Sequence, residues 1–95
     1  GSTTGNFPTE INLDQNYPNP FNPSTKISFT LPVAGYTTLS VYDIIGREVA
    51  TVLQSSLDAG RHDAAFNADG LAAGVYLYRL GSGSTVLTRR MVLLK

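Results

Sequence analysis

The sequence predicts an all-β fold, a small immunoglobulin-like antiparallel β-sandwich of about seven strands. Short runs rich in β-branched, aromatic and other apolar residues follow one another from Ile11 onward, and Gly, Pro, Asn or Asp separates each run from the next. No helical period persists long enough to predict a helix. With 95 residues, the chain has room for one domain with one core.

Residues 1–10 differ in character from the rest of the chain. They are small, polar and proline-containing, without a hydrophobic period, so we expect a flexible linker there. Gly1 and Ser2 are typical of the remnant that an expression tag leaves behind. Residues 11–95 are then the folded domain, and a first strand is expected near Ile11 to Tyr17.

The clearest strand runs from Lys26 to Leu31. Its apolar residues alternate with polar ones, which is the pattern of a strand with one buried face. The same alternation recurs in later runs. We expect the following residues inside the core: Ile27, Phe29, Leu31, Leu39, Val41, Phe66 and Val75.

Further strands and turns follow in order. Thr37 to Asp43 alternates, and Ile44 to Gly46 makes the next turn, where Gly46 suits a left-handed backbone position. The run from Glu48 to Gln54 has an irregular phase, which leaves a β-bulge or one helical turn open. The run Val75–Leu80 is apolar on both faces, so we expect a central strand that is covered on both sides. The remaining elements are a turn at Leu57–Gly60, a strand at Arg61–Phe66, a crossing at Asp69–Gly74, a hairpin loop at Gly81–Ser84 and a final strand at Thr85–Leu94.

The charge balance and composition argue against several classes of partner. Seven Lys and Arg residues balance seven Asp and Glu residues, whereas nucleic-acid binding and polybasic membrane attachment need a basic face. The chain has no cysteine, which excludes disulfides and Cys-based zinc sites. No apolar run approaches the roughly 20 residues that span a bilayer. We therefore expect no nucleic acid partner and no membrane span.

Residues suited to catalysis or metal binding are sparse. His62 is the only histidine and lies on an alternating run, where a half-buried or surface role is more common than catalysis. The aspartates near turns stand singly, which favours turn capping over a calcium loop. They are Asp43, Asp58, Asp63 and Asp69. We expect no enzyme activity, no cofactor and no metal.

Tyr17 to Ser24 is the least generic stretch of the chain. Three prolines within six residues fix three φ angles and exclude a central strand. We expect a stiff ribbon in which Tyr17 and Phe21 are the packing groups. Asn19 and Asn22 are expected to bond nearby backbone groups that the prolines leave without partners. Two roles stay open, a rigid plug at one end of the sandwich or a preformed recognition surface.

The carboxyl end is unusually apolar for a chain terminus. Consecutive side chains of a strand point to opposite faces, so Val92, Leu93 and Leu94 cannot all reach one core. At least one of them is expected to be exposed. The final strand is either wedged between the sheet and loops or a docking strand whose free edge pairs with a partner by strand addition.

Four stretches carry distinctive motifs, in the order Leu13–Thr25, Val41–Val49, Leu71–Leu80 and Arg90–Lys95. Together they resemble the opening motif, the hairpin motif, the Gly-x-Tyr strand and the lysine-bearing terminus of the type IX secretion system C-terminal sorting domains, type A. On this resemblance, the recognition motif comprises Tyr17, Pro18, Asn19, Pro20, Phe21, Asn22, Pro23, Gly46, Arg47, Gly74, Tyr76, Arg79, Leu93, Leu94 and Lys95.

The resemblance implies a secretion signal domain that directs a larger, upstream cargo protein through the outer-membrane type IX translocon. It implies transit through the periplasm of a Gram-negative cell and a final location at the cell surface or outside the cell. A sortase usually cuts such a domain from its cargo. We expect that cut between Gly1 and Leu13, since a protease needs extended, unpaired backbone. The domain is then the substrate of an enzyme, not an enzyme.

One alternative function stays open, an immunoglobulin-like accessory or carbohydrate-contacting module of a secreted enzyme. A sugar-binding face needs several exposed aromatic side chains in one row. The candidates are Tyr36, Tyr42, Tyr76 and Tyr78. Tyrosines in strands are more often packing pairs across a sheet.

Overall fold

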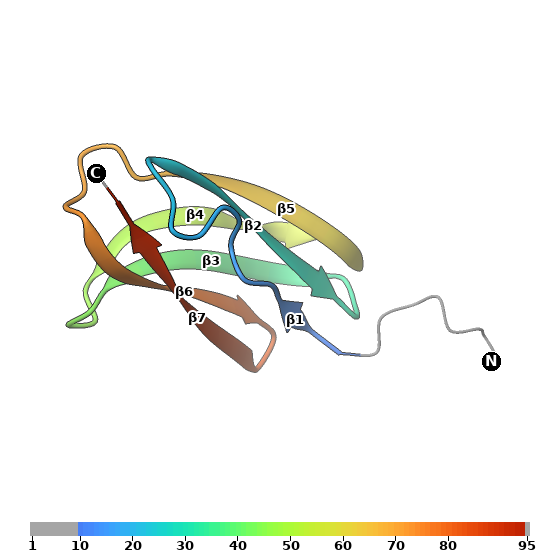
Figure 1. The fold of residues 1–95 in the computed structure, drawn as a ribbon. Helices are drawn as coiled ribbons and strands as arrows, with labels where there is room; N and C mark the ends of the chain where they lie inside the picture. The colour runs from blue at the N-terminus through green and yellow to red at the C-terminus, as the bar shows by residue number, and fades with distance from the viewer. Residues whose placement is uncertain (1–9, 95) are drawn as a thin grey trace.

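The computed structural model describes residues 10–94, which fold into antiparallel strands (Figure 1). The strands are β1 (Asn12–Leu13), β2 (Ser24–Leu31), β3 (Gly35–Asp43), β4 (Glu48–Leu57), β5 (Gly60–Asn67), β6 (Gly74–Ser82) and β7 (Thr85–Leu93). No helix occurs among the described residues. The predicted all-β sandwich of about seven strands is confirmed. The predicted linker, residues 1–10, lies outside the described residues except for Glu10.

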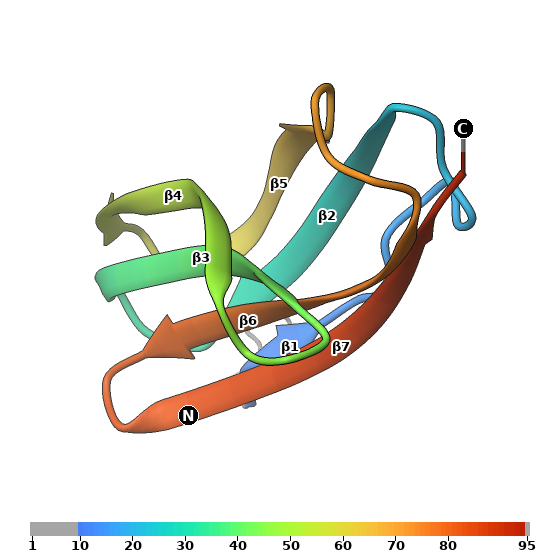
Figure 2. The same cartoon turned by 90° about the vertical axis from the view of Figure 1, so that its left-hand side faces the viewer.

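The strands form two sheets that face each other (Figure 2). One sheet has the order β1-β2-β5, and the other has the order β4-β3-β6-β7. The chain therefore passes from one sheet to the other between β2 and β3, between β4 and β5, and between β5 and β6. Strands β3 and β6 are the central strands of the larger sheet.

Alternation along each strand directs one face into the core between the sheets. The predicted residues of β2, β3 and β5 are buried there, with Phe66 the most exposed of them at 6%. They are Ile27, Phe29, Leu31, Leu39, Val41 and Phe66. The core also contains Leu13, Phe21, Ala68, Tyr76, Tyr78, Leu80, Met91 and Leu93.

The prediction that Val75 is buried is wrong, because its side chain is 38% exposed. The inward positions of β6 are Tyr76, Tyr78 and Leu80, and alternation then turns Val75 and Arg79 outward. β6 is central, as predicted, but Val75 and Arg79 are exposed on its outer face. The prediction that this strand is covered on both sides is therefore also wrong.

β4 is irregular, in agreement with the phase of its sequence. Leu39 of β3 pairs with Leu53, but the next residue, Ser40, pairs with Thr51, so Val52 is an extra residue in β4. A second register shift follows further along the same pair of strands. The β-bulge is confirmed, and the alternative of one helical turn is wrong.

Two other boundaries differ from prediction. The first strand is limited to Asn12 and Leu13. Beyond Leu13 the chain stays beside β2 only through separate contacts, the hydrogen bond from the Asp14 N–H to the Ser28 oxygen and an isolated bridge between Tyr17 and Lys26. Gly81 and Ser82 belong to β6, so the hairpin loop narrows to Gly83 and Ser84. Gly83 has a φ of 60°, a left-handed conformation that glycine adopts without strain.

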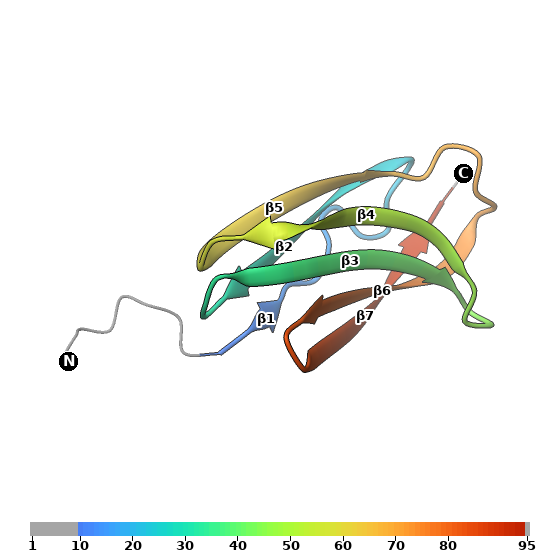
Figure 3. The same ribbon diagram turned by 180° about the vertical axis from the view of Figure 1, so that it is seen from behind.

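The sandwich has two distinct ends (Figures 1 and 3). The near end is where the described chain begins, and it holds the β2–β3 turn and the β6–β7 hairpin. The far end holds the β3–β4 hairpin, the loop between β5 and β6, and the last described residues of β7. The near end and the far end are separated by the length of the strands.

Candidate recognition site

The motif segments converge on the far end of the sandwich. Gly74, at the start of β6, lies opposite Leu93, near the end of β7. Tyr76 lies opposite Asp43, which precedes the β3–β4 hairpin. Phe21 forms a parallel bridge with Leu93. The fold therefore brings together segments that are up to about 70 residues apart in sequence, as the pairing of Phe21 with Leu93 illustrates.

Residues 14–23, here called the lead-in, run between β2 and β7. Asn16 is buried and anchors this segment. Its side-chain amide donates to the carbonyl oxygen of Pro18 at 3.1 Å and to the hydroxyl of Thr25 at 3.0 Å. The Thr25 hydroxyl in turn donates to the same Pro18 oxygen. These side chains supply donors in a segment where prolines carry no N–H.

The predicted packing role of Tyr17 is wrong, because its side chain is 78% exposed. The backbone of Tyr17 exchanges two hydrogen bonds of 2.9 Å with Lys26 of β2. Neighbouring side chains point in opposite directions, and Asn16 takes the inward position. Phe21 is buried as predicted, with its ring 6.2 Å from that of Phe66 between centroids.

The lead-in also pairs with the outer edge of β7. The Phe21 N–H donates to the Val92 oxygen at 3.0 Å, and the Leu94 N–H donates to the Phe21 oxygen at 2.9 Å. The Val92 N–H donates to the side-chain oxygen of Asn19 at 3.0 Å. Asn19 thus bonds a backbone group as predicted, but in a distant strand.

This pairing favours the wedged strand over the docking strand at the carboxyl end. The end of β7 lies between β6 and the lead-in. Its edge at Val92 and Leu94 is already hydrogen-bonded to Phe21, so it is not the free edge that strand addition needs. The prediction that one terminal residue is exposed is confirmed, since Leu94 is 50% exposed while Leu93 is buried. Lys95 lies outside the described residues.

Tyr78 connects the lead-in to the larger sheet. Its hydroxyl donates to the Asp14 carbonyl oxygen at 2.7 Å and accepts from the Asn16 N–H at 2.8 Å. The tyrosine side chain is fully buried. Burial disfavours the charged phenolate and therefore raises the pKa of Tyr78 above its usual value.

The β3–β4 hairpin is held rigid by Asp43. One carboxylate oxygen accepts from the N–H groups of Ile45 and Arg47, and the other accepts from the Arg47 guanidinium at 3.0 Å. The Arg47 N–H is the main cause that lowers the pKa of Asp43, although partial desolvation opposes it. Gly46 has a φ of 93°, which confirms the predicted left-handed position.

This rigid hairpin presents two apolar side chains to solvent. Ile44 and Ile45 are each 70% exposed. Turns usually contain Gly, Pro, Asn, Asp or Ser, so two isoleucines between Asp43 and Gly46 need an explanation. Their hydrophobicity alone suggests burial, but their place between an aspartate and a glycine is the sequence signal for exposure.

Two other motif residues have structural roles. The Tyr76 hydroxyl donates to the Ala72 oxygen at 2.6 Å and fixes the loop before β6. Arg79 is not at the far end but midway along β6, on the outer face of the sheet. Its guanidinium carbon lies 4.6 Å from the centre of the Tyr42 ring, which is a cation–π contact.

The structure does not provide the row of tyrosines that carbohydrate contact would need. Tyr76 and Tyr78 are in the core, at 7% and 0% exposure. Tyr36 and Tyr42 remain on the outer face, at opposite ends of β3. Tyr42 is also covered in part by Arg79.

No group of three potential metal ligands occurs within residues 10–94. A ring nitrogen of His62 lies 2.8 Å from the Asp58 carbonyl oxygen, and the ring stacks on Phe29. Both contacts hold the start of β5 in place. None of the described residues belongs to a helix that could cross a membrane.

Comparison with known proteins agrees with the motif segments. Residues 15–94 match the family described as the secretion system C-terminal sorting domain. A comparison with curated proteins gives no match. The matched range begins in the lead-in, ends at Leu94 and covers the convergent segments of the far end. The chain therefore belongs to the secretion system C-terminal sorting domains, which serve as signals for export by the type IX pathway.

Proposed function

We propose that this domain directs a larger cargo protein, fused upstream of it, through the outer-membrane type IX translocon, and that a sortase then removes it. Membership of the sorting-domain family carries this proposal. A sorting domain implies a secretion machinery that reads it, a fused cargo, and export to the cell surface or the extracellular space. The translocon, periplasmic transit and the sortase are the proposed steps.

The proposed role is that of an enzyme substrate, not of an enzyme. The expected cut between Gly1 and Leu13 falls mostly outside the described residues. Asn12 and Leu13 pair with Thr30 and Phe29 of β2, and a protease needs unpaired backbone. We therefore place the cut before Asn12.

The far end is the proposed recognition surface for the translocon. It combines the motif segments with exposed apolar side chains on a rigid frame. Ile44 and Ile45 extend from a hairpin that Asp43 fixes, so binding would require little further ordering of that loop. Leu94 and Tyr17 add exposed apolar area at the same end.

Reporter export tests both parts of the proposal. The domain is fused to the carboxyl end of a periplasmic reporter in a cell with a type IX system, and reporter is measured in the medium and at the cell surface. We expect export of the fusion. Retention in the periplasm, with the domain folded, would refute the function.

A matched pair of variants tests the recognition surface. Ile44→Ser with Ile45→Ser removes the exposed apolar tip of the far end. Val86→Ser changes a residue that is 58% exposed near the opposite end. The first fusion should lose most of its export and the second should keep it. Equal export of the two would leave the sorting function intact but reject this surface.

A further inference from the structure

The outer face of the larger sheet carries an apolar cluster flanked by two arginines. The strand register places Leu77 of β6 beside Tyr42 of β3 and Arg90 of β7. Side chains two residues apart in a strand share a face, so Val75 and Arg79 lie on either side of Leu77. We call this surface the outer patch, and its residues are Tyr42, Val75, Leu77, Arg79, Arg90 and Val92, which pairs with Val75.

The outer patch is open to solvent. Val75 is 38% exposed, and both arginines are exposed as well. Leu77, Tyr42 and Val92 are half-buried. Apolar side chains that cluster on a surface beside charged ones are typical of a contact with another protein.

Arg79 and Arg90 differ from the other arginines of the chain. Arg47 and Arg61 each donate to a carboxylate, and Arg89 donates to a backbone carbonyl oxygen. Neither guanidinium of the outer patch forms an ion pair with a carboxylate of residues 10–94. The N–H donors of Arg79 and Arg90 are therefore available to a partner.

The two arginines lie close enough to hold one anion. Because Leu77 pairs with Arg90, Arg79 is the diagonal neighbour of Arg90 on the same face. Diagonal positions of a sheet are about 7–8 Å apart, within the reach of long side chains. Tyr42 restricts Arg79, whose guanidinium carbon lies over the ring at 4.6 Å from its centre. This contact leaves the N–H groups of the guanidinium free to donate hydrogen bonds.

Glu48 is the acidic residue on this face of the sheet, and it does not occupy the patch. It pairs with Tyr42 from β4, and β3 separates β4 from β6. Its carboxylate accepts from the Thr51 hydroxyl at 2.6 Å. A carboxylate for Arg79 and Arg90 must therefore come from elsewhere than the described strands.

We propose that the outer patch binds an acidic segment of a partner protein, with one carboxylate held between Arg79 and Arg90. A planar guanidinium matches a carboxylate through two parallel hydrogen bonds. An apolar side chain next to that carboxylate would rest on Leu77 and Val75. The chain as a whole has no net charge, so a long polyanion such as a nucleic acid would find no basic field beyond these two cations. This inference does not rest on the secretion function.

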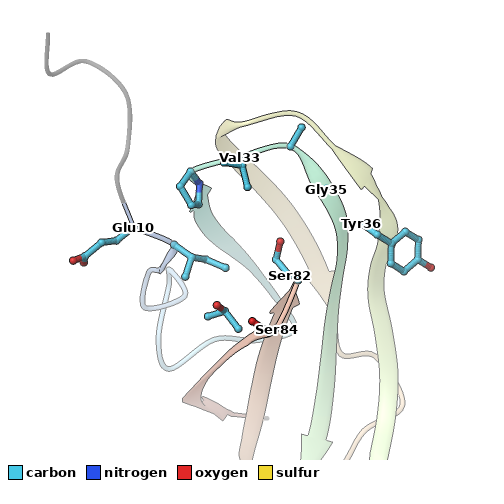
Figure 4. A pocket seen from close by; sticks show the side chains of 11 residues that line it. Glu10, Val33, Gly35, Tyr36, Ser82 and Ser84 are labelled. Carbon is cyan, nitrogen blue, oxygen red and sulfur yellow. The ribbon is translucent and has the colours of Figure 1, made fainter. Parts of the chain in front are cut away.

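A cavity at the near end of the sandwich offers no comparable anchor (Figure 4). Its volume is about 840 Å³, and Glu10 is the charged residue of its lining. Figure 4 shows that the Glu10 side chain points away from the cavity. No charged side chain among the described lining residues is therefore placed to orient a ligand there, whereas the outer patch has two.

NMR spectroscopy of the purified chain tests the proposal. The probe is a capped tetrapeptide of alternating leucine and glutamate, and the control peptide has glutamine in place of glutamate. We expect the glutamate peptide to shift the Nε–H signals of Arg79 and Arg90 in a saturable manner, and the control peptide to leave them in place. Equal shifts with the two peptides would overturn the proposal. Equal shifts with inorganic phosphate at the same concentration would also overturn it, because they would indicate a site for free anions.

Charge-matched variants locate the binding. Arg79→Gln and Arg90→Gln each remove one positive charge from the outer patch, and Arg61→Gln removes one from β5 in the smaller sheet. All three side chains are exposed, and thermal unfolding verifies that each variant is folded. Both patch variants should bind the glutamate peptide several-fold more weakly, whereas Arg61→Gln should bind it as the wild type does. Equal affinity of all three variants would overturn the proposal.

Arg79→Lys separates a shaped site from general attraction between charges. Lysine keeps the positive charge and lacks the planar fork that matches a carboxylate. We expect Arg79→Lys to bind the glutamate peptide several-fold more weakly than the wild type. Wild-type affinity in this variant would show that charge alone is sufficient and would overturn the proposed geometry.

Discussion

Replacement of Tyr78 by phenylalanine tests whether the lead-in is fixed by one buried hydroxyl. The Tyr78→Phe variant keeps the ring and removes only the oxygen. That oxygen accepts from the Asn16 N–H and donates to the Asp14 carbonyl. Asn16 is 2% exposed, so water cannot replace its lost partner without a local rearrangement.

The magnitude follows from these two hydrogen bonds. A buried donor left without a partner costs about 1–3 kcal/mol. Asp14 is only partly buried, so its carbonyl adds little. We expect the free energy of unfolding to fall by about 2 kcal/mol. With a urea m-value of about 1–2 kcal/mol per M for a small domain, the unfolding midpoint should fall by about 1–2 M.

Urea unfolding measures this change, and Tyr36→Phe is the matched control. Tyr36 is 54% exposed, so its variant should unfold at the wild-type midpoint. If Tyr78→Phe also keeps the wild-type midpoint, the hydroxyl does not hold the lead-in and the reasoning is refuted.

The same residue predicts a dependence on alkaline pH. Burial raises the pKa of Tyr78 in the folded protein, so the unfolded chain loses this proton first as the pH rises above about 10. The contribution is fully present below the unfolded pKa and is lost as the pH rises through the folded pKa. Wild-type stability should therefore decline above about pH 10, and the Tyr78→Phe variant should decline less.

Two further predictions concern the core and the far-end hairpin. Phe29 is fully buried, so Phe29→Ala should lower the free energy of unfolding by about 3–5 kcal/mol, as measured by urea titration. A loss below about 1 kcal/mol would contradict the central position of Phe29 in the core. Gly46→Ala should lower thermal stability by the equivalent of about 1–2 kcal/mol, because a φ of 93° strains any residue with a Cβ; an unchanged melting temperature would indicate that the hairpin relaxes freely.

Local patterns predicted those elements whose partners follow from alternation. Polar and apolar residues alternate from Lys26 to Leu31 in β2, and the apolar residues Ile27, Phe29 and Leu31 are buried as this pattern predicts. β6 is apolar at successive positions, so its pattern could not show which face is inward. The tyrosines of β6 fill the core because its register with β3 and β7 directs them there, and that register is not a local property.

The candidate site was predictable as separate motifs but not as one surface. The burial of Asn16 instead of Tyr17 depends on the hydroxyl of Tyr78, which lies 62 residues further along the chain. The occupied edge of β7 depends on Phe21 and Asn19 in the same way. Such contacts arise from the fold as a whole, and no short stretch of sequence contains them.

The placement of the two ends has a mechanical consequence. In the proposed export, a fused cargo would pull on the domain at Ile11, and a translocon bound at the far end would resist that pull along the strand axis. The load would shear β1 against β2, so the bonds that pair Asn12 with Thr30 and Leu13 with Phe29 would be stretched together, not opened one by one. The two hydrogen bonds of Tyr78 lie next along the loaded chain and would share the force. Bonds that share a load in this way would let the domain stay folded while it transmits the pull between the translocon and the cargo.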